Sequence, residues 1–277
     1  MDQQRPLLEA IYRLYENSGF AMAGAVAFSL IVSLFPFCIF LGAVASVFGG
    51  RELAAQAVEQ LFAVMPKGVA EALAPQVQQI MGESRVGLLT ISGLIALFFA
   101  TSANETLRTA LNGAYRVTET RPYIQCLSLS TFFVFLSAIA MLIITWVLVV
   151  GPNIIQLVKI PVLGSLLESG WHAGAIRYLL AAAAFGIYLL ALHLWLAGGS
   201  RTLGDVWPGI LLSIVLMLAL AGLYSRYLQF SDYTQFYAGL SQIMVALIFF
   251  QAVAVVILLG AELNRGIMEL SRASAGA

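Results

Sequence analysis

"SQIMVALIFFQAVAVVILLGAELNRG", residues 241–266, is an apolar run as long as a membrane span, and it closes on an acidic residue, Glu262. About 20 mostly apolar residues are enough for a helix to cross the hydrocarbon core of a bilayer. An ionised carboxylate at the edge of that core is costly unless a partner, a cavity or water reaches it. The stretch therefore predicts a membrane helix with a polar environment at its end.

The composition of the whole chain is that of a membrane protein. Its 277 residues are 61% hydrophobic and 10% charged, whereas soluble domains are about half apolar and roughly a quarter charged. The 14 basic residues are balanced by 14 acidic ones, so no basic excess is available for a nucleic-acid backbone. Cys38 and Cys126 lie inside apolar runs, which argues against a disulfide framework or a thiolate metal site.

Six apolar runs of spanning length follow one another along the chain. They cover residues 20–48, 86–104, 124–150, 177–198, 207–224 and 241–262. We therefore expect an all-α, polytopic membrane protein whose single domain takes in residues 1–277. No internal repeat relates the first three runs to the last three.

The segments between and around the spans are amphipathic or polar. Residues 49–85 carry apolar side chains at helical spacing, which predicts amphipathic helices on the membrane or capping the bundle. Residues 1–18 form a charged, amphipathic segment without a cleavage motif, and residues 263–277 form a tail.

Positive charges in the flanking segments predict the orientation. With the N-terminus inside, eight arginines lie on the cytoplasmic side: Arg5, Arg13, Arg108, Arg116, Arg121, Arg201, Arg265 and Arg272. The outer side holds Arg51, Lys67, Arg85, Lys159, Arg177 and Arg226 on longer segments. The higher density of positive charge on the shorter segments favours both termini in the cytoplasm.

Three segments far apart in sequence bring polar residues to one predicted membrane level. They are "ATSANETLR" (100–108), "GGSRTLGDVWPG" (198–209) and "ELNR" (262–265). The candidates for a substrate site or gate are Glu262, Asn264, Arg108, Asn104, Glu105, Arg201 and Asp205. We expect Glu262 to be ionised and paired with Arg108, with Asn104 and Asn264 completing the hydrogen bonding. A structural clasp between helices and a polar vestibule at the mouth of a cavity are both open.

Two further places are candidates for function. Pro36 removes a backbone hydrogen bond inside the first span, and Ser33 or a neighbouring helix could satisfy the freed group, as a packing kink or as a hinge for transport. Gly19, Ala23 and Ala27 stand four apart, which allows close helix packing. In the outer segment 225–240, Tyr233 and Tyr237 belong to an aromatic cluster that suits an interfacial anchor or a surface on which a substrate stacks.

Motifs of enzyme chemistry are missing from the sequence. His172 and His193 have no second His, Cys or Asp at metal-ligand spacing, and there is neither a Walker loop nor a GxSxG elbow. We therefore expect no catalytic residue, no metal, no cofactor and no enzymatic activity.

Five short motifs resemble the YihY/BrkB family of bacterial inner-membrane proteins. They are "AVAFSLIVSLFPFCIFL" (25–41), "ALNGAYRVTETRP" (110–122), "RTLGDVWPG" (201–209), "YAGLSQ" (237–242) and "GAELNR" (260–265), in the family's order. The resemblance implies six helices in the bacterial cytoplasmic membrane and an association with virulence and envelope biogenesis. Members have also carried the label ribonuclease BN, for which this sequence offers neither metal ligands nor a basic groove.

Two classes of function fit these observations. One is a transporter or flippase-like protein for an amphipathic or anionic envelope molecule, with a membrane lipid or lipid-like substrate. The other is a non-catalytic scaffold or assembly factor in envelope biogenesis. A water-filled cavity ending at Glu262 and Arg108 would favour transport, and a sealed bundle would favour a scaffold. The sequence specifies neither the substrate nor the oligomeric state.

Overall fold

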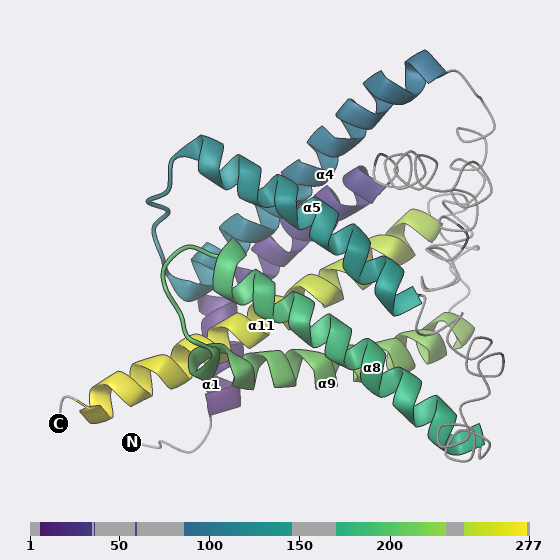
Figure 1. The fold of residues 1–277 in the computed structure, drawn as a ribbon. Helices are drawn as coiled ribbons and strands as arrows, with labels where there is room; N and C mark the ends of the chain where they lie inside the picture. Colours follow the sequence, from purple (N-terminus) through teal and green to yellow (C-terminus); the bar gives the residue numbers. More distant parts are fainter. Residues whose placement is uncertain are drawn as a thin grey trace, which may run out of the picture.

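A computed structural model of the chain describes residues 6–34, 36, 59, 86–145, 170–230 and 241–275, and its regular elements are all helical (Figure 1). The elements are α1 (Pro6–Glu16), a helix over Gly19–Leu34, α4 (Val86–Tyr115), α5 (Tyr123–Thr145), α8 (Gly170–Ala191), the π-helical turn η2 (Leu192–Leu196), α9 (Leu203–Phe230) and α11 (Ser241–Ala275). The predicted all-α fold is confirmed for these ranges.

Four stretches of these helices are long and apolar enough to cross a membrane: Tyr123–Ala140, Leu179–Leu196, Leu203–Leu220 and Ala246–Ser274. α1 and the helix Gly19–Leu34, bent by 72° at their junction, count as a fifth if the pair is one span. The chain is therefore a multi-pass membrane protein. The count of six remains a prediction, since residues 37–48 and 146–150 and the amphipathic segment 49–85, except Glu59, lie outside the described residues.

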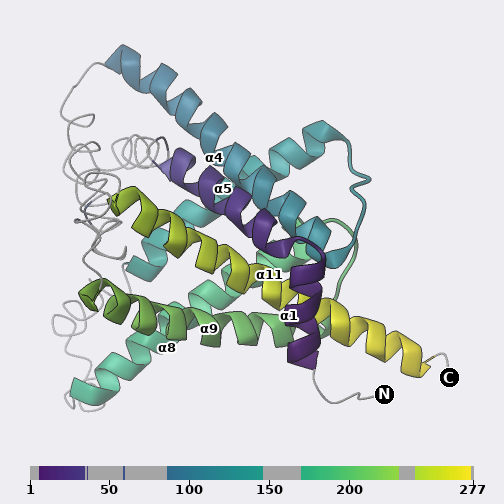
Figure 2. The same cartoon turned by 180° about the vertical axis from the view of Figure 1, so that it is seen from behind.

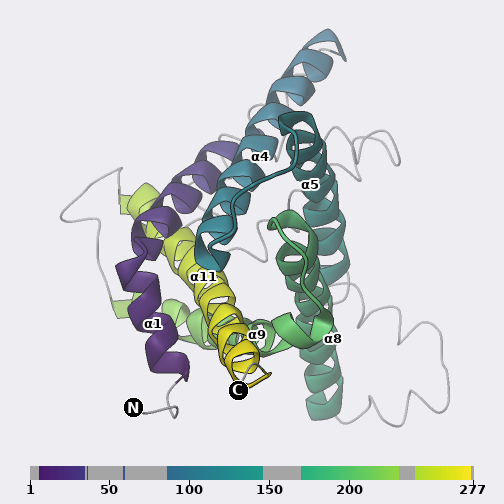
Figure 3. The same cartoon turned by 90° about the vertical axis from the view of Figure 1, so that its left-hand side faces the viewer.

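Five of the helices contact one another in a closed order. α4 packs on α5, α5 on α8, α8 on α9, α9 on α11, and α11 again on α4. α1 packs against α11 near the end of the molecule where both termini lie, as the view from behind shows (Figure 2). Seen from that end, α11 lies between α1 and α8 (Figure 3).

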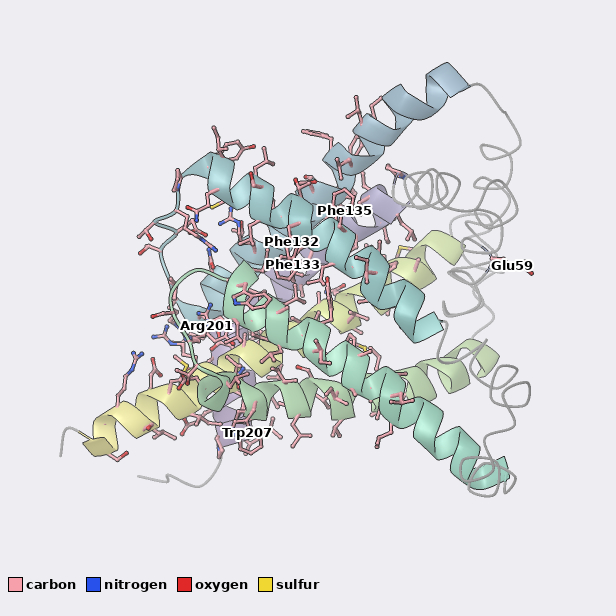
Figure 4. All side chains as sticks on the ribbon, in the orientation of Figure 1. Glu59, Phe132, Phe133, Phe135, Arg201 and Trp207 are labelled. Carbon is pink, nitrogen blue, oxygen red and sulfur yellow. The ribbon has the colours of Figure 1, made fainter. Side chains whose placement is uncertain are left out.

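Side chains divide between the inside of this arrangement and its outer surface. Phe133 is fully buried, whereas Phe132 and Phe135 on the same helix are 52% and 41% exposed (Figure 4). α4 turns small residues inward, among them Ala103 and Ala110, which lets neighbouring helices approach closely. Large apolar side chains on the outside are expected where lipid rather than water is the solvent.

The bend between α1 and the helix Gly19–Leu34 is built from polar and glycine residues. The Asn17 side chain donates to Arg13 O at 2.6 Å, and Ser18 adopts a positive φ of 57°. A Cβ on Gly19 would lie 2.3 Å from Leu14 Cδ1, so a residue with a side chain would clash at this position of the bend. Ala23 and Ala27 are fully buried, in keeping with the close packing predicted for this helix.

The hinge candidates lie at the edge of what the structure describes. The Ser33 hydroxyl donates to Leu30 O at 2.9 Å, and Pro36 is helical. The chain between Pro36 and the next described helix contains Glu59 as its one described residue, so the proposed hinge stays a prediction. Tyr233 and Tyr237 also lie outside the described residues.

α9 and α11 cross at two glycines. A Cβ on Gly209 would lie 2.1 Å from Gly260 O, and a Cβ on Gly260 would lie 2.4 Å from Ser213 Oγ. The Gly209 N–H donates to Asn264 Oδ1 at 2.6 Å, in the turn that follows Pro208. The motifs "RTLGDVWPG" and "GAELNR" thus meet at this crossing, where backbone approaches backbone.

Candidate functional site

Polar residues gather at the end of the bundle that carries both termini. Two connections meet there, residues 116–122 between α4 and α5 and residues 197–202 between η2 and α9, and Arg201 marks the place in Figure 4. Buried polar and charged side chains toward this end include Asn104, Arg108, Asn112, His193, Glu262 and Asn264. Each such group needs a hydrogen-bond or ion-pair partner within the protein, because neither lipid nor apolar side chains can provide one.

Glu262, only 1% exposed, pairs with an arginine as predicted, but the predicted partner was wrong. Arg116 Nη1 lies 3.2 Å from Glu262 Oε2, and Arg108 bonds elsewhere. The physical reason is the length of α4, which continues to Tyr115 instead of leaving the membrane level near residue 104. Arg108 therefore lies about 12 Å back along the helix axis from the position where Arg116 meets Glu262, at roughly 1.5 Å per residue.

The two asparagines expected to bond Glu262 bond other helices. Asn104 Nδ2 donates to Ser130 O of α5 at 3.1 Å. Asn264 accepts from Gly209 N of α9 and donates from Nδ2 to the Tyr115 hydroxyl at 3.1 Å. That part of the prediction was wrong, because both amide groups form hydrogen bonds that join two helices, and neither of them bonds the Glu262 carboxylate.

Arg108 belongs to a separate ion cluster around Glu119. Glu119 Oε2 accepts from Arg108 Nη1 at 2.5 Å and from Asn112 Nδ2 at 3.1 Å, and its Oε1 accepts from Arg121 Nε at 2.7 Å. The Arg121 hydrogen bonds in particular hold the pKa of the Glu119 carboxyl far below its usual range. Arg108 Nη2 also reaches Glu105 Oε2 at 2.6 Å. Glu105 and Arg108 are thus part of a clasp that holds the 116–122 connection against α4.

Arg121 extends this clasp to the π-helical turn. Its Nη1 donates to Trp195 O and its Nη2 to Leu196 O, each at 3.0 Å. A helix end leaves carbonyl groups without intrahelical partners, and a guanidinium with five donors can serve several of them. The Gly198 N–H donates to Asn112 Oδ1 at 2.6 Å, so both connections are fixed to α4.

A buried chain of hydrogen bonds passes from His193 to Gly209. His193 Nδ1 lies 2.8 Å from the Tyr115 hydroxyl, which accepts from Asn264 Nδ2. Because Asn264 Oδ1 is already bonded by the Gly209 N–H, its Nδ2 is the donor, and the tyrosine proton is directed to Nδ1. His193 is then neutral with its proton on Nε2, and that atom has no partner among the described residues. The π-turn that carries His193 is a feature often found at functional sites.

A cavity of about 400 Å³ opens at this end of the molecule. Its lining comes from the end of α4, the 197–202 connection and the last turns of α11: Tyr115, Arg116, Val117, Gly199, Ser200, Arg201, Arg265, Met268, Glu269 and Arg272. Four arginines against one glutamate make it strongly cationic. We call this cavity the arginine pocket.

Arg201 is fixed at the wall of the arginine pocket by neutral groups. Its Nε donates to His193 O at 2.8 Å and its Nη2 to Ala197 O at 3.0 Å, while Cζ lies 4.0 Å above the centre of the Tyr115 ring. No carboxylate forms an ion pair with it in the described ranges. Burial lowers the pKa of the Arg201 guanidinium from its usual value.

The sequence candidates divide between the pocket and its surroundings. Arg201 lines the pocket, and Glu262 forms an ion pair with Arg116, which also lines it. Asp205 accepts from Thr202 N at 2.8 Å and Thr202 Oγ1 at 2.7 Å, so its side chain caps the start of α9. Asn104, Glu105, Arg108 and Asn264 are helix contacts outside the lining.

Sequence reasoning did not select several pocket residues, namely Tyr115, Arg265, Glu269 and Arg272. A usable signal was present in the spacing of Glu262, Arg265, Glu269 and Arg272, which alternate in charge at steps of three and four and so share one helix face. Within the described part of the chain, no group of three His, Cys, Asp or Glu side chains is placed to hold a metal ion.

Comparisons with known proteins cover nearly the entire chain. The family model described as virulence factor BrkB matches residues 10–276. A protein of Bacillus subtilis (strain 168) named ribonuclease-like protein YfkH is 26% identical over 261 residues, which are 93% of either chain. No solved structure matches this chain. The matched region includes all of the residues that line the arginine pocket.

Proposed function

This chain belongs to the BrkB family of virulence factors, and from that premise we propose that it is a transporter or flippase-like protein for an amphipathic, anionic molecule of the bacterial envelope. The observation that carries the proposal is the arginine pocket, a cationic cavity at one end of a bundle of membrane-length helices. An anionic head group finds its charge partners in such a pocket, while an apolar tail stays against the outer faces of the helices.

The outer surface of the bundle supports a lipid-like substrate. Near the pocket, Trp195, Leu203 and Trp207 are each about 60% exposed, at 59%, 61% and 59%. Trp207 points away from the bundle in Figure 4. Trp side chains favour the membrane–water interface because one end of the ring system is apolar and the other can donate a hydrogen bond. These residues suggest that the pocket opens near the head-group level, where an amphipathic molecule resides.

We also propose that this end faces the cytoplasm across the bacterial inner membrane. The support is the collection of arginines at the termini and at the two described connections, in the sense of the positive-inside rule. Both termini then lie in the cytoplasm, and the arginine pocket takes its ligand at the cytoplasmic leaflet.

Neither ribonuclease activity nor nucleic-acid binding forms part of this proposal. The Bacillus relative is named ribonuclease-like, but ribonuclease chemistry on this chain would need groups to activate water and a surface to hold the backbone. We expect the purified protein to cleave RNA no faster than a preparation carrying both His172→Ala and His193→Ala. A metal-dependent activity that either change abolished would contradict the proposal.

Reconstitution tests the transport proposal. The full chain would be placed in phosphatidylcholine vesicles that carry a trace of fluorescent anionic or zwitterionic lipid, and movement between leaflets would be followed by reduction of the dye from outside. We expect the anionic lipid to move faster than in protein-free vesicles and the Arg272→Gln protein to move it more slowly. Movement equal to that in protein-free vesicles would contradict transport and favour the scaffold alternative.

A further inference from the structure

The arginine pocket contains two guanidinium groups whose charge is not matched at close range. Arg116 is paired with Glu262 at 3.2 Å, and Arg265 is paired with Glu269 at 2.6 Å. Glu269 also serves Arg13 of α1 at 3.0 Å, so its two oxygens are in use. Among the residues that the structure describes, Arg201 and Arg272 form no ion pair. The pocket therefore has room for negative charge.

The position of Arg201 leaves one of its terminal nitrogens available to an acceptor oxygen of a ligand. Its Nε and Nη2 are held by main-chain carbonyls, which orients the guanidinium and leaves Nη1 without a protein acceptor in the described part of the chain. Nη1 lies 3.9 Å from the place a Cβ on Gly199 would take, and Gly199 has a φ of +82°. The absence of a side chain at Gly199 keeps this face of Arg201 open toward the pocket. Asp205, the carboxylate at the start of α9, accepts from Thr202 through Oδ2; it lies within electrostatic range of Arg201 and Arg272 but forms an ion pair with neither.

We propose that the arginine pocket binds a phosphate monoester group, with Arg201 and Arg272 as its direct partners. A phosphate monoester carries roughly −1.5 to −2 charges at neutral pH and three acceptor oxygens, which matches two guanidinium groups that form no ion pair in the described ranges. A phosphodiester or a carboxylate brings one charge and satisfies one of them. This inference rests on the proposed function and specifies the group that the pocket binds, a terminal phosphate, whether it is carried by a lipid or free in solution.

Binding to the full chain in phosphatidylcholine nanodiscs tests the proposal. The probes are a short-chain phosphatidate, a short-chain phosphatidylglycerol and inorganic phosphate, each titrated by calorimetry at neutral pH. We expect phosphatidate to bind at least about tenfold more tightly than phosphatidylglycerol, because one charge-assisted contact is worth roughly that factor. Inorganic phosphate that binds as tightly as phosphatidate would identify a free phosphate as the ligand, and weaker binding would identify a lipid head group; both are forms of the proposal.

Variants distinguish a specific effect of the pocket residues on phosphatidate binding from a general effect of the protein's charge. Arg272 is exposed and forms no ion pair within the described ranges, so Arg272→Gln should fold normally and weaken phosphatidate binding by about tenfold. Ser274→Asp makes the same change in charge on the same helix outside the lining, and we expect less than about a twofold effect from an exposed, screened charge. Arg201→Lys keeps the charge but cannot donate to the His193 and Ala197 carbonyls and to a ligand in the same planar arrangement, so we expect it to reduce the preference for phosphatidate.

The outcomes distinguish this inference from the proposed function. Equal affinity for the two lipids, or equal effects of Arg272→Gln and Ser274→Asp, would overturn the phosphate site even if the vesicle assay shows that lipid is moved. The predicted affinities without any lipid movement in vesicles would support the phosphate site and contradict the transport proposal.

Discussion

A substitution at Glu262 can distinguish a structural role of this residue from a functional one. Glu262 is buried, and its ion-pair partner Arg116 also lines the arginine pocket. Glu262→Gln keeps the shape of the side chain and removes its charge. We expect normal amounts of folded protein in the membrane and a transport rate lower by at least about tenfold, or roughly 1.4 kcal/mol, because Arg116 would then be free to hold the ligand's anion too firmly.

Vesicle transport and thermal unfolding of the same Glu262→Gln preparation are the two measurements. A large fall in thermal stability would contradict the functional role, since it would make the Arg116–Glu262 pair a clasp between α4 and α11.

Glu119 should be a structural residue whose effect depends on pH. Its carboxylate accepts from Arg108, Asn112 and Arg121, so Glu119→Gln should reduce the free energy of unfolding by about 1–3 kcal/mol at pH 7. Because the pKa of Glu119 is lowered on folding from an ordinary 4.5, its stabilisation is complete above that value and is lost as the pH falls toward the lower folded pKa.

The midpoint of thermal unfolding, measured from pH 7 to pH 3, checks this prediction for Glu119. The difference between the unchanged protein and Glu119→Gln should be constant above about pH 5 and shrink below it. A difference that grows as the pH falls would show that the assigned role is wrong.

At the scale of the elements, the crossing of α9 and α11 is a helix contact that has no space for an added side chain. A Cβ on Gly209 would lie 2.1 Å from Gly260 O, where neither backbone has room to yield. Gly209→Ala should therefore cost about 1–3 kcal/mol of stability or more. Gly222→Ala in the same helix meets no atom within 4 Å and is the matched control, expected to be neutral or slightly stabilising. Thermal unfolding in detergent measures both, and equal midpoints would contradict the close crossing.

The sequence predicted the existence of these helices better than their ends. Apolar runs of spanning length are a strong signal, and those beginning at residues 86, 124, 177, 207 and 241 overlap with α4, α5, α8, α9 and α11. The polar residues after Ala103 suggested an exit from the membrane, yet α4 continues to Tyr115 because Asn104 and Arg108 find partners inside the protein. The π-turn at His193 contains neither Gly nor Pro, so the sequence carries no local signal for it.

The partners of individual charges were harder to predict, for a related reason. Glu262 was correctly expected to need an arginine, which follows from the cost of burial alone. The choice of Arg116 over Arg108 depends on how far α4 extends and on which carboxylates the 116–122 connection brings back to Arg108. Such choices are made by tertiary packing, and a single sequence does not encode them locally.

At the scale of the whole molecule, the position of the termini tests the proposed orientation. Single cysteines placed at Leu7 and Ser274, in a protein with Cys38 and Cys126 replaced, should react with a membrane-impermeant maleimide in lysed cells and not in intact spheroplasts. The reason is that α1, which contains Leu7, and the C-terminal end of α11, which contains Ser274, both lie at the end of the bundle that carries the termini (Figure 3). Labelling of both positions in intact spheroplasts would reverse the orientation and place the arginine pocket on the outer side.

The central claim is that the arginine pocket receives the head group of an anionic amphipathic molecule. A structure determined by electron cryomicroscopy in nanodiscs made with bacterial lipid tests it most directly. We predict density for a head group in contact with Arg201 and Arg272, continuous with an acyl chain along the outer face of the bundle. A pocket that contains only solvent or is closed by side chains, with lipid confined to the outside of the helices, would contradict the claim.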